Sequence, residues 1–182
     1  ALLVASTYAG LFIILSASSY AYIGVLGLSS AQYGMAMAWG SLVYIVGTFF
    51  CRRWLKQHGL VGTVQRGAFF TLAGGLGMAT CSVMTVPALP AVMLAQSLFA
   101  FGHGLHQPCG QTGAVGPFPQ MAGVASALAG CLLALIAFAV GLWLGSALDG
   151  TLRPLGIGLA VASSVTATVA WTLVRWHGQM PR

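Results

Sequence analysis

The sequence predicts an all-α polytopic membrane protein with about six transmembrane helices. Hydrophobic types make up 58% of its 182 residues and charged types only 4%, whereas roughly a quarter of a soluble domain is charged. Residues 1–51, 67–148 and 154–174 contain no Asp, Glu, Lys or Arg. Because one span needs about 20 mostly apolar residues, these stretches have room for two, three and one spans. The alternation of apolar and polar residues that β-barrel strands require is absent.

Gly, Pro and charged residues divide the chain into the individual helices. We expect spans at residues 2–27, 31–50, 64–85, 90–112, 121–148 and 155–175. The predicted connections are the turn at Gly27 to Ser30, the polar segment 52–62, the prolines Pro87 and Pro90, the prolines Pro117 and Pro119, and residues 149–154.

The positive charges predict the orientation of these spans. One set of loops and termini carries Arg52, Arg53, Lys56, Arg66, Arg175 and Arg182. The opposite set carries only Arg153, four residues from Asp149. The positive-inside rule therefore places both termini in the cytoplasm. The net charge of +6 does not form a long basic face, so we expect no nucleic-acid partner.

The fourth span carries a polar stripe, which consists of Gln96, His103, Gln107 and Gln111. Their separations of 7, 4 and 4 residues put them on one helix face within an arc of about 80°. Polar groups at membrane depth are costly unless they meet partners or water, so the stripe should point inward and is a candidate pathway wall. Interhelical hydrogen bonding without a ligand is the alternative.

Two further features of the spans suit solute binding. Pro108 lies within the stripe and leaves a backbone carbonyl near Gly104 without its helical donor, so we predict a kink or gate there. The first two spans contribute Tyr20, Tyr22, Trp39 and Tyr44, whose rings suit bulky apolar or cationic solutes.

The ionisable side chains argue against catalysis. His103 could titrate near neutral pH and carry a proton, or stay neutral and hydrogen bonded. A metal site at His103 and His106 would need further ligands, and the four cysteines lie far apart without metal-ligand spacing. No nucleophile motif accompanies Asp149. We therefore predict no enzyme, metal or cofactor. Because the chain opens at Ala1 inside an apolar run, we expect a fragment rather than a signal peptide.

Several motifs resemble a known transporter family. They are Gly27-Leu28-Ser29, Gln32-Tyr33-Gly34, Cys51-Arg52-Arg53-Trp54-Leu55 with Gly59, Phe101-Gly102-His103-Gly104 with Pro108, and the run from Pro117 to Gly130. The chain resembles the C-terminal half of a major facilitator superfamily transporter, and the last run is similar to Bcr/CflA-type drug:proton antiporters. The resemblance covers nearly the whole chain, as helices seven to twelve of a twelve-helix fold.

The resemblance implies multidrug efflux and antibiotic resistance by proton-coupled alternating access in the bacterial inner membrane. The implied partners are the lipid bilayer, the missing N-terminal six-helix half, an amphipathic small-molecule substrate and protons. In such families the coupling carboxylates lie mainly in the N-terminal half. A carrier for another small metabolite and a non-transporting membrane scaffold are the alternatives.

Overall fold

The computed structural model describes residues 2–84 and 88–177, and it is helical throughout, with no strand in these two ranges. Its elements are α1 (Leu2–Ser19), the π-helix η1 (Tyr20–Val25), α2 (Ser30–Val83), α3 (Leu89–Val115), the 3₁₀ turn η2 (Pro119–Met121), α4 (Ala122–Ala147), α5 (Arg153–Trp171) and α6 (Leu173–His177). The all-α prediction is therefore confirmed.

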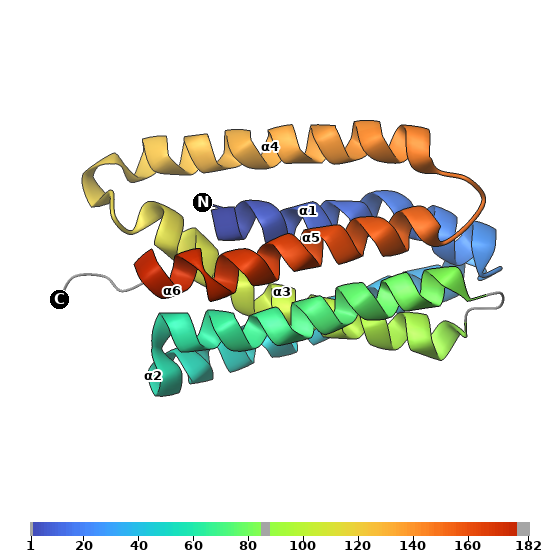
Figure 1. Ribbon diagram of the computed structural model, residues 1–182, viewed down its shortest axis with the longest axis horizontal. Helices are drawn as coiled ribbons and strands as arrows, with labels where there is room; N and C mark the ends of the chain where they lie inside the picture. The colour runs from blue at the N-terminus through green and yellow to red at the C-terminus, as the bar shows by residue number, and fades with distance from the viewer. Residues whose placement is uncertain (1, 85–87, 178–182) are drawn as a thin grey trace.

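The long helices run side by side along the longest axis of the molecule (Figure 1). Helix α2 doubles back on itself, and α4 lies along the outer side of α1 and α5 (Figure 1). The start of α1, the bend in α2, the α3–α4 connection and α6 lie toward one end of the bundle. The end of η1, the last turn of α2, the first turn of α3 and the α4–α5 connection lie toward the opposite end, so successive helical segments run in alternating directions (Figure 1).

The predicted polar connection at residues 52–62 is helical rather than a loop, apart from one break. Helix α2 continues through this segment, and within it Gly59 has non-helical backbone angles, at φ 67° and ψ −177°. A positive φ is accessible to glycine, so one residue reverses the chain between a first leg, residues 30–58, and a second leg, residues 60–83. Polar composition misled the prediction because Arg, Lys and Gln are good helix formers.

The other predicted boundaries lie within a few residues of the observed helix ends. The 31–50 and 64–85 spans form parts of the two legs of α2, and the 90–112 span lies within α3. The 155–175 span is divided between α5 and α6. Pro87 and the end of the 64–85 span lie outside the described residues.

The distribution of side chains suits a lipid surrounding. Among the described residues, four helical segments are long and apolar enough to cross a membrane, namely Leu2–Val25, Ser30–Val83, Pro119–Ala147 and Arg153–Trp176. Large apolar side chains face outward, as at Phe49 (67% exposed) and Phe138 (66% exposed), while the polar Thr7, Thr71 and Ser163 are fully buried. This arrangement is the reverse of a water-soluble domain, where polar side chains cover the surface.

Glycines bring α2 and α3 into backbone contact. A Cβ atom on Gly47 would lie 2.5 Å from the carbonyl oxygen of Phe101, and one on Gly104 would lie 2.5 Å from that of Tyr44. On the second leg, a Cβ on Gly74 would lie 2.5 Å from the backbone nitrogen of Phe99. Small residues permit such close helix packing in lipid. Both legs of α2 are therefore held against α3, which positions the side chains described next.

Candidate functional site

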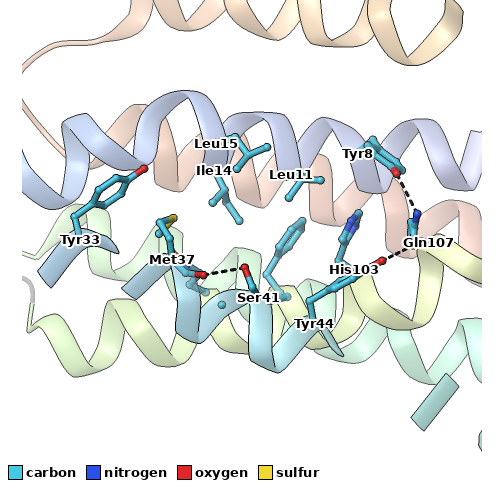
Figure 2. A pocket seen from close by; sticks show the side chains of 14 residues that line it. Tyr8, Leu11, Ile14, Leu15, Tyr33, Met37, Ser41, Tyr44, His103 and Gln107 are labelled. Atoms are coloured by element: carbon cyan, nitrogen blue, oxygen red, sulfur yellow. Dashed lines mark hydrogen bonds between the residues drawn. The ribbon is translucent and has the colours of Figure 1, made fainter. Parts of the chain in front are cut away.

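A cavity of about 320 Å³ lies between α1, the first leg of α2 and α3 (Figure 2). Most of its wall is apolar, with Leu11, Ile14 and Leu15 contributed by α1 and Met37 by α2. Polar and aromatic groups from all three helices interrupt this wall. A mainly apolar cavity with a few placed polar groups is the usual form of a small-molecule site.

Three of the four residues of the predicted stripe line this cavity, namely Gln96, His103 and Gln107. Gln96 and His103 are each only 4% exposed, and Gln107 is half-buried. Gln111 is also half-buried, but it does not line the cavity. The structure therefore brings the first three together in one cavity wall and leaves Gln111 farther along α3.

Gln107 joins the hydroxyl groups of two tyrosines from different helices. The Tyr44 hydroxyl on α2 donates a hydrogen bond of 2.5 Å to Gln107 Oε1, and Gln107 Nε2 donates one of 3.1 Å to the Tyr8 hydroxyl on α1. Figure 2 shows this bridge at one end of the cavity. One amide side chain thus links α1, α2 and α3 at the cavity wall.

The His103 ring lies among aromatic rings and one hydroxyl group. Its Nδ1 atom is hydrogen bonded to Thr7 Oγ1 on α1 at 2.9 Å. The Phe99 ring stacks on it at 6.1 Å between centroids, and Tyr8 meets it edge-on at 5.4 Å. The Tyr44 ring lies at 5.6 Å. The imidazole ring of His103 is therefore part of an aromatic cluster.

Two of the predicted aromatic residues lie at the end of α1 rather than in the cavity. Tyr22 in η1 is fully buried, and its hydroxyl donates a hydrogen bond of 2.5 Å to Gln96 Oε1. Tyr20 is half-buried, and its hydroxyl would lie 3.8 Å from a Cβ placed on Gly150 in the α4–α5 connection. Only Tyr22 is thereby linked to the cavity, through Gln96.

Trp39 lies outside the cavity. Its side chain is 52% exposed, and its indole Nε1 donates a hydrogen bond of 3.0 Å to Ser97 Oγ on α3. Trp39 and Tyr44 belong to the same leg of α2, but only Tyr44 lines the cavity.

Of the two residues predicted to form a kink or gate, Gly104 lies in the tight seam between α2 and α3. Gly104 permits the backbone contact with Tyr44 described above. α3 continues as one helix through Pro108 to Val115. Because proline has no N–H, the carbonyl of Gly104 has no helical donor at Pro108. Gating at this position remains a prediction.

His106 belongs to a different contact from His103. It is fully buried against the second leg of α2, where its Nε2 atom lies 3.0 Å from the Val64 carbonyl oxygen. Because a carbonyl oxygen only accepts, Nε2 carries the proton of the neutral ring. Thr71 Oγ1 lies 3.4 Å from the other ring nitrogen. This histidine joins two helices and does not line the cavity.

Several residues of the cavity wall were not predicted, namely Tyr8, Phe99, Tyr33 and Met37. Thr7, which does not line the cavity, supports the wall through its hydrogen bond to His103. One signal was available for Phe99, because it lies four residues before His103 and helical residues four apart share a face. Tyr8 carried no comparable signal, since the first span has no polar stripe to set its inward face.

The side chains that line the cavity include no Asp, Glu, Lys or Arg. Within the described ranges, no group of three or more His, Cys, Asp or Glu side chains is placed to hold a metal ion. The chemistry of this wall is therefore that of hydrogen bonding, stacking and apolar contact. Comparison with family models, curated proteins and solved structures finds no match.

Proposed function

We propose that the chain is the C-terminal half of a proton-coupled multidrug efflux transporter, a Bcr/CflA-type member of the major facilitator superfamily, and that the cavity holds an amphipathic solute. The observation that carries the proposal is the cavity itself, an apolar chamber with amide, imidazole and phenol groups among helices whose large apolar side chains face outward. The sequence motifs, through their resemblance to that family, are the support for the choice of family.

The fold of α2 supports a count of six crossings. Its two legs reverse direction at Gly59, and each is long enough to cross a bilayer at 1.5 Å per residue. If α1 with η1 forms one crossing, and α3, α4 and α5 form one each, the proposed topology has six. Six is the number of helices in one half of the proposed family fold.

The charges support an orientation with the bend of α2 in the cytoplasm of a bacterial cell. Arg52, Arg53 and Lys56 immediately precede Gly59, and Arg175 on α6 lies toward the same end of the bundle (Figure 1). Arg153, which begins α5, is at the opposite end. An excess of Lys and Arg marks the cytoplasmic side, so both ends of this chain would be cytoplasmic.

The side chains of the cavity wall favour one class of solute. Four aromatic rings offer stacking and cation–π contact, namely Tyr8, Tyr33, Tyr44 and Phe99, and Gln96 and Gln107 offer hydrogen bonds. With no formal charge in the wall, a solute with a delocalised positive charge or none is favoured over an anion. Proton coupling then belongs to carboxylates of the N-terminal half, since the one acidic residue, Asp149, lies in a connection.

A membrane scaffold is the second candidate, and one observation favours it. Gln96, His103 and Gln107 each make a hydrogen bond to another helix, so the stripe also has a purely structural use. A scaffold would need these contacts but not the cavity. The experiment must therefore separate the loss of solute contacts from the loss of folded protein.

The test compares two aromatic substitutions on the same leg of α2 in the complete transporter. Tyr44→Ala removes a ring from the cavity wall, and Trp39→Ala removes a larger ring outside it. Efflux of a lipophilic cationic dye under an imposed proton gradient is measured, together with the amount of folded transporter in the membrane. We expect Tyr44→Ala to raise the apparent KM several-fold at unchanged protein amount, and Trp39→Ala to leave KM unchanged. Absence of efflux for every dye and drug tried, or equal changes in both variants, contradicts the proposal.

A further inference from the structure

Two cysteines from different helices lie in contact on the other side of α3. The Sγ atom of Cys51, on the first leg of α2, lies 3.5 Å from the Sγ atom of Cys109 on α3. Cys51 Sγ also lies 3.5 Å from the carbonyl oxygen of Leu105. Both cysteines are free thiols and almost fully buried, at 1% and 3% exposed. The remaining two, Cys81 and Cys131, are also free.

The backbone seam between these helices holds the two thiols together. One helical turn before Cys51, Gly47 meets the backbone of Phe101, and farther along α3 Gly104 meets the backbone of Tyr44. Bulkier residues at these two glycines would push the helices apart. The Cβ atoms of a disulfide must approach to about 3.5–4.5 Å, and a seam with direct backbone contact is the setting in which residues on two helices can do so.

We propose that Cys51 and Cys109 form a dithiol that a small peroxide oxidises to an intramolecular disulfide. One thiol, as its thiolate, attacks a peroxide oxygen, the O–O bond breaks, and a sulfenic acid forms with release of water or alcohol. The second sulfur then attacks the sulfenic sulfur and expels water. Two thiols lose two protons and two electrons, and the peroxide takes up both, so the atoms and electrons balance.

The surroundings favour this reaction over metal binding. In the described ranges, no group of three or more His, Cys, Asp or Glu side chains is placed to hold a metal ion. A disulfide is as neutral as the two thiols it replaces, so its formation adds no charge to an apolar interior. A metal bound by two thiolates would need further ligands.

A small neutral oxidant has a route to the pair. Cys109 lines a second cavity, of about 420 Å³, together with Leu2, Leu3, Leu60 and Val64. This wall is apolar, so it admits an uncharged peroxide and excludes a charged reagent. Cys109 is thus the thiol that meets the oxidant, and Cys51, behind it, resolves the sulfenic acid.

The disulfide would join the two helices that carry the cavity wall. Cys51 follows Tyr44 by about two helical turns, and Cys109 lies two residues after Gln107. The bond between Tyr44 and Gln107 would then span helices that are covalently linked. Oxidation would therefore hold the first leg of α2 at a constant distance from α3, whatever solute the cavity binds.

The experiment treats the membrane-embedded protein with hydrogen peroxide, then denatures it, alkylates the remaining thiols and maps the peptides by mass spectrometry. We expect a peptide pair linked through Cys51 and Cys109, with parallel loss of both alkylated thiols and their recovery after reduction. Exposed Cys131 on α4 serves as the internal control for peroxide reaching the protein, because it should oxidise without joining Cys51 or Cys109.

Two cysteine variants test which thiols form the disulfide. Cys51→Ala should abolish the linked peptide and leave Cys109 as a sulfenic acid that dimedone traps when the protein is denatured, while Cys81→Ala should leave the linkage intact. Full alkylation of Cys51 and Cys109 under conditions that oxidise Cys131 would overturn the proposal. So would a linkage that joins two chains.

Discussion

Gly67 lies directly against the imidazole of His106, so that a Cβ atom on Gly67 would be 2.7 Å from the Nε2 nitrogen. The same nitrogen lies 3.0 Å from the carbonyl oxygen of Val64, one turn earlier in the second leg of α2. The His106 ring is thus held between the backbone of the second leg of α2 and its own helix, α3. The absence of a side chain at Gly67 is what allows a buried histidine to reach its acceptor.

Gly67→Ala should destabilise the protein. The added methyl group must displace the His106 ring, which is fully buried, and overpacking of this kind costs about 1–3 kcal/mol. Gly130→Ala on α4 is the matched control, because a Cβ at Gly130 meets nothing within 4 Å. Thermal denaturation in detergent micelles should show a lower midpoint for the first variant alone. An unchanged midpoint for Gly67→Ala would contradict the contact.

Neighbouring positions on α3 should differ in their accessibility to water-soluble reagents. In a background with the four native cysteines replaced by alanine, Gln107→Cys should react with a methanethiosulfonate because Gln107 lines the cavity. His106→Cys should not, because His106 is fully buried and lies outside the cavity wall. The measurement is the labelling rate in membrane vesicles. Equal rates at the two positions would show that no water-filled chamber exists at this depth.

The bond between Tyr44 and Gln107 should appear as a coupling energy. In a cycle of Tyr44→Phe, Gln107→Leu and the double variant, we expect a coupling of about 0.6 kcal/mol, the mean for hydrogen bonds between membrane helices, and at most about 1.7 kcal/mol. Trp39→Phe combined with Gln107→Leu is the control pair, because Trp39 is bonded to Ser97 instead. The readout is the free energy of unfolding in mixed micelles, and additivity in the first cycle would refute the bond.

Asp149 should titrate below the usual range of an aspartate. Its Oδ1 atom accepts hydrogen bonds from the Thr151 hydroxyl at 2.6 Å and the Thr151 backbone N–H at 3.0 Å. The hydroxyl bond is the main cause that lowers the pKa of this carboxyl, with a smaller contribution from Arg153. Since Asp149 is the one acidic residue of the chain, carbon-13 labelling of aspartate isolates its carboxyl signal.

The pH titration of the Asp149 carboxyl signal tests the hydrogen bonds between Asp149 and Thr151. Because the folded-state pKa is lowered, the stabilisation is present above the pKa of the unfolded chain and is lost as the pH falls through the folded-state value. We expect Thr151→Val to move the midpoint back toward the ordinary value of about 3.9. Thr112→Val, which removes a hydroxyl from α3, should leave it unchanged. A wild-type midpoint at or above the ordinary value would refute the bonds.

Three residues of the candidate cavity wall could be predicted from spacing along one helix. Separations of 7 and 4 residues place Gln96, His103 and Gln107 on one face of α3 in any α-helix, so their shared position needs no tertiary information. The choice between Trp39 and Tyr44 could not be made in this way. Both are aromatic residues of an apolar helix, and only packing against α3 decides which one turns inward.

The sequence by itself determined that the chain is helical and suited to lipid, because long stretches without charge can bury their backbone polar groups only within helices. It also determined which face of α3 is polar. Only the tertiary structure decided that Gly59 turns α2 back on itself, that Tyr8 and Tyr44 meet at Gln107, and that Cys51 touches Cys109. These relationships depend on how the helices are rotated and how closely they approach. In an apolar chain, the rotation of each helix and the distance between helices are set by how side chains and glycines fit together between them. The periodicity of one helix does not contain this information.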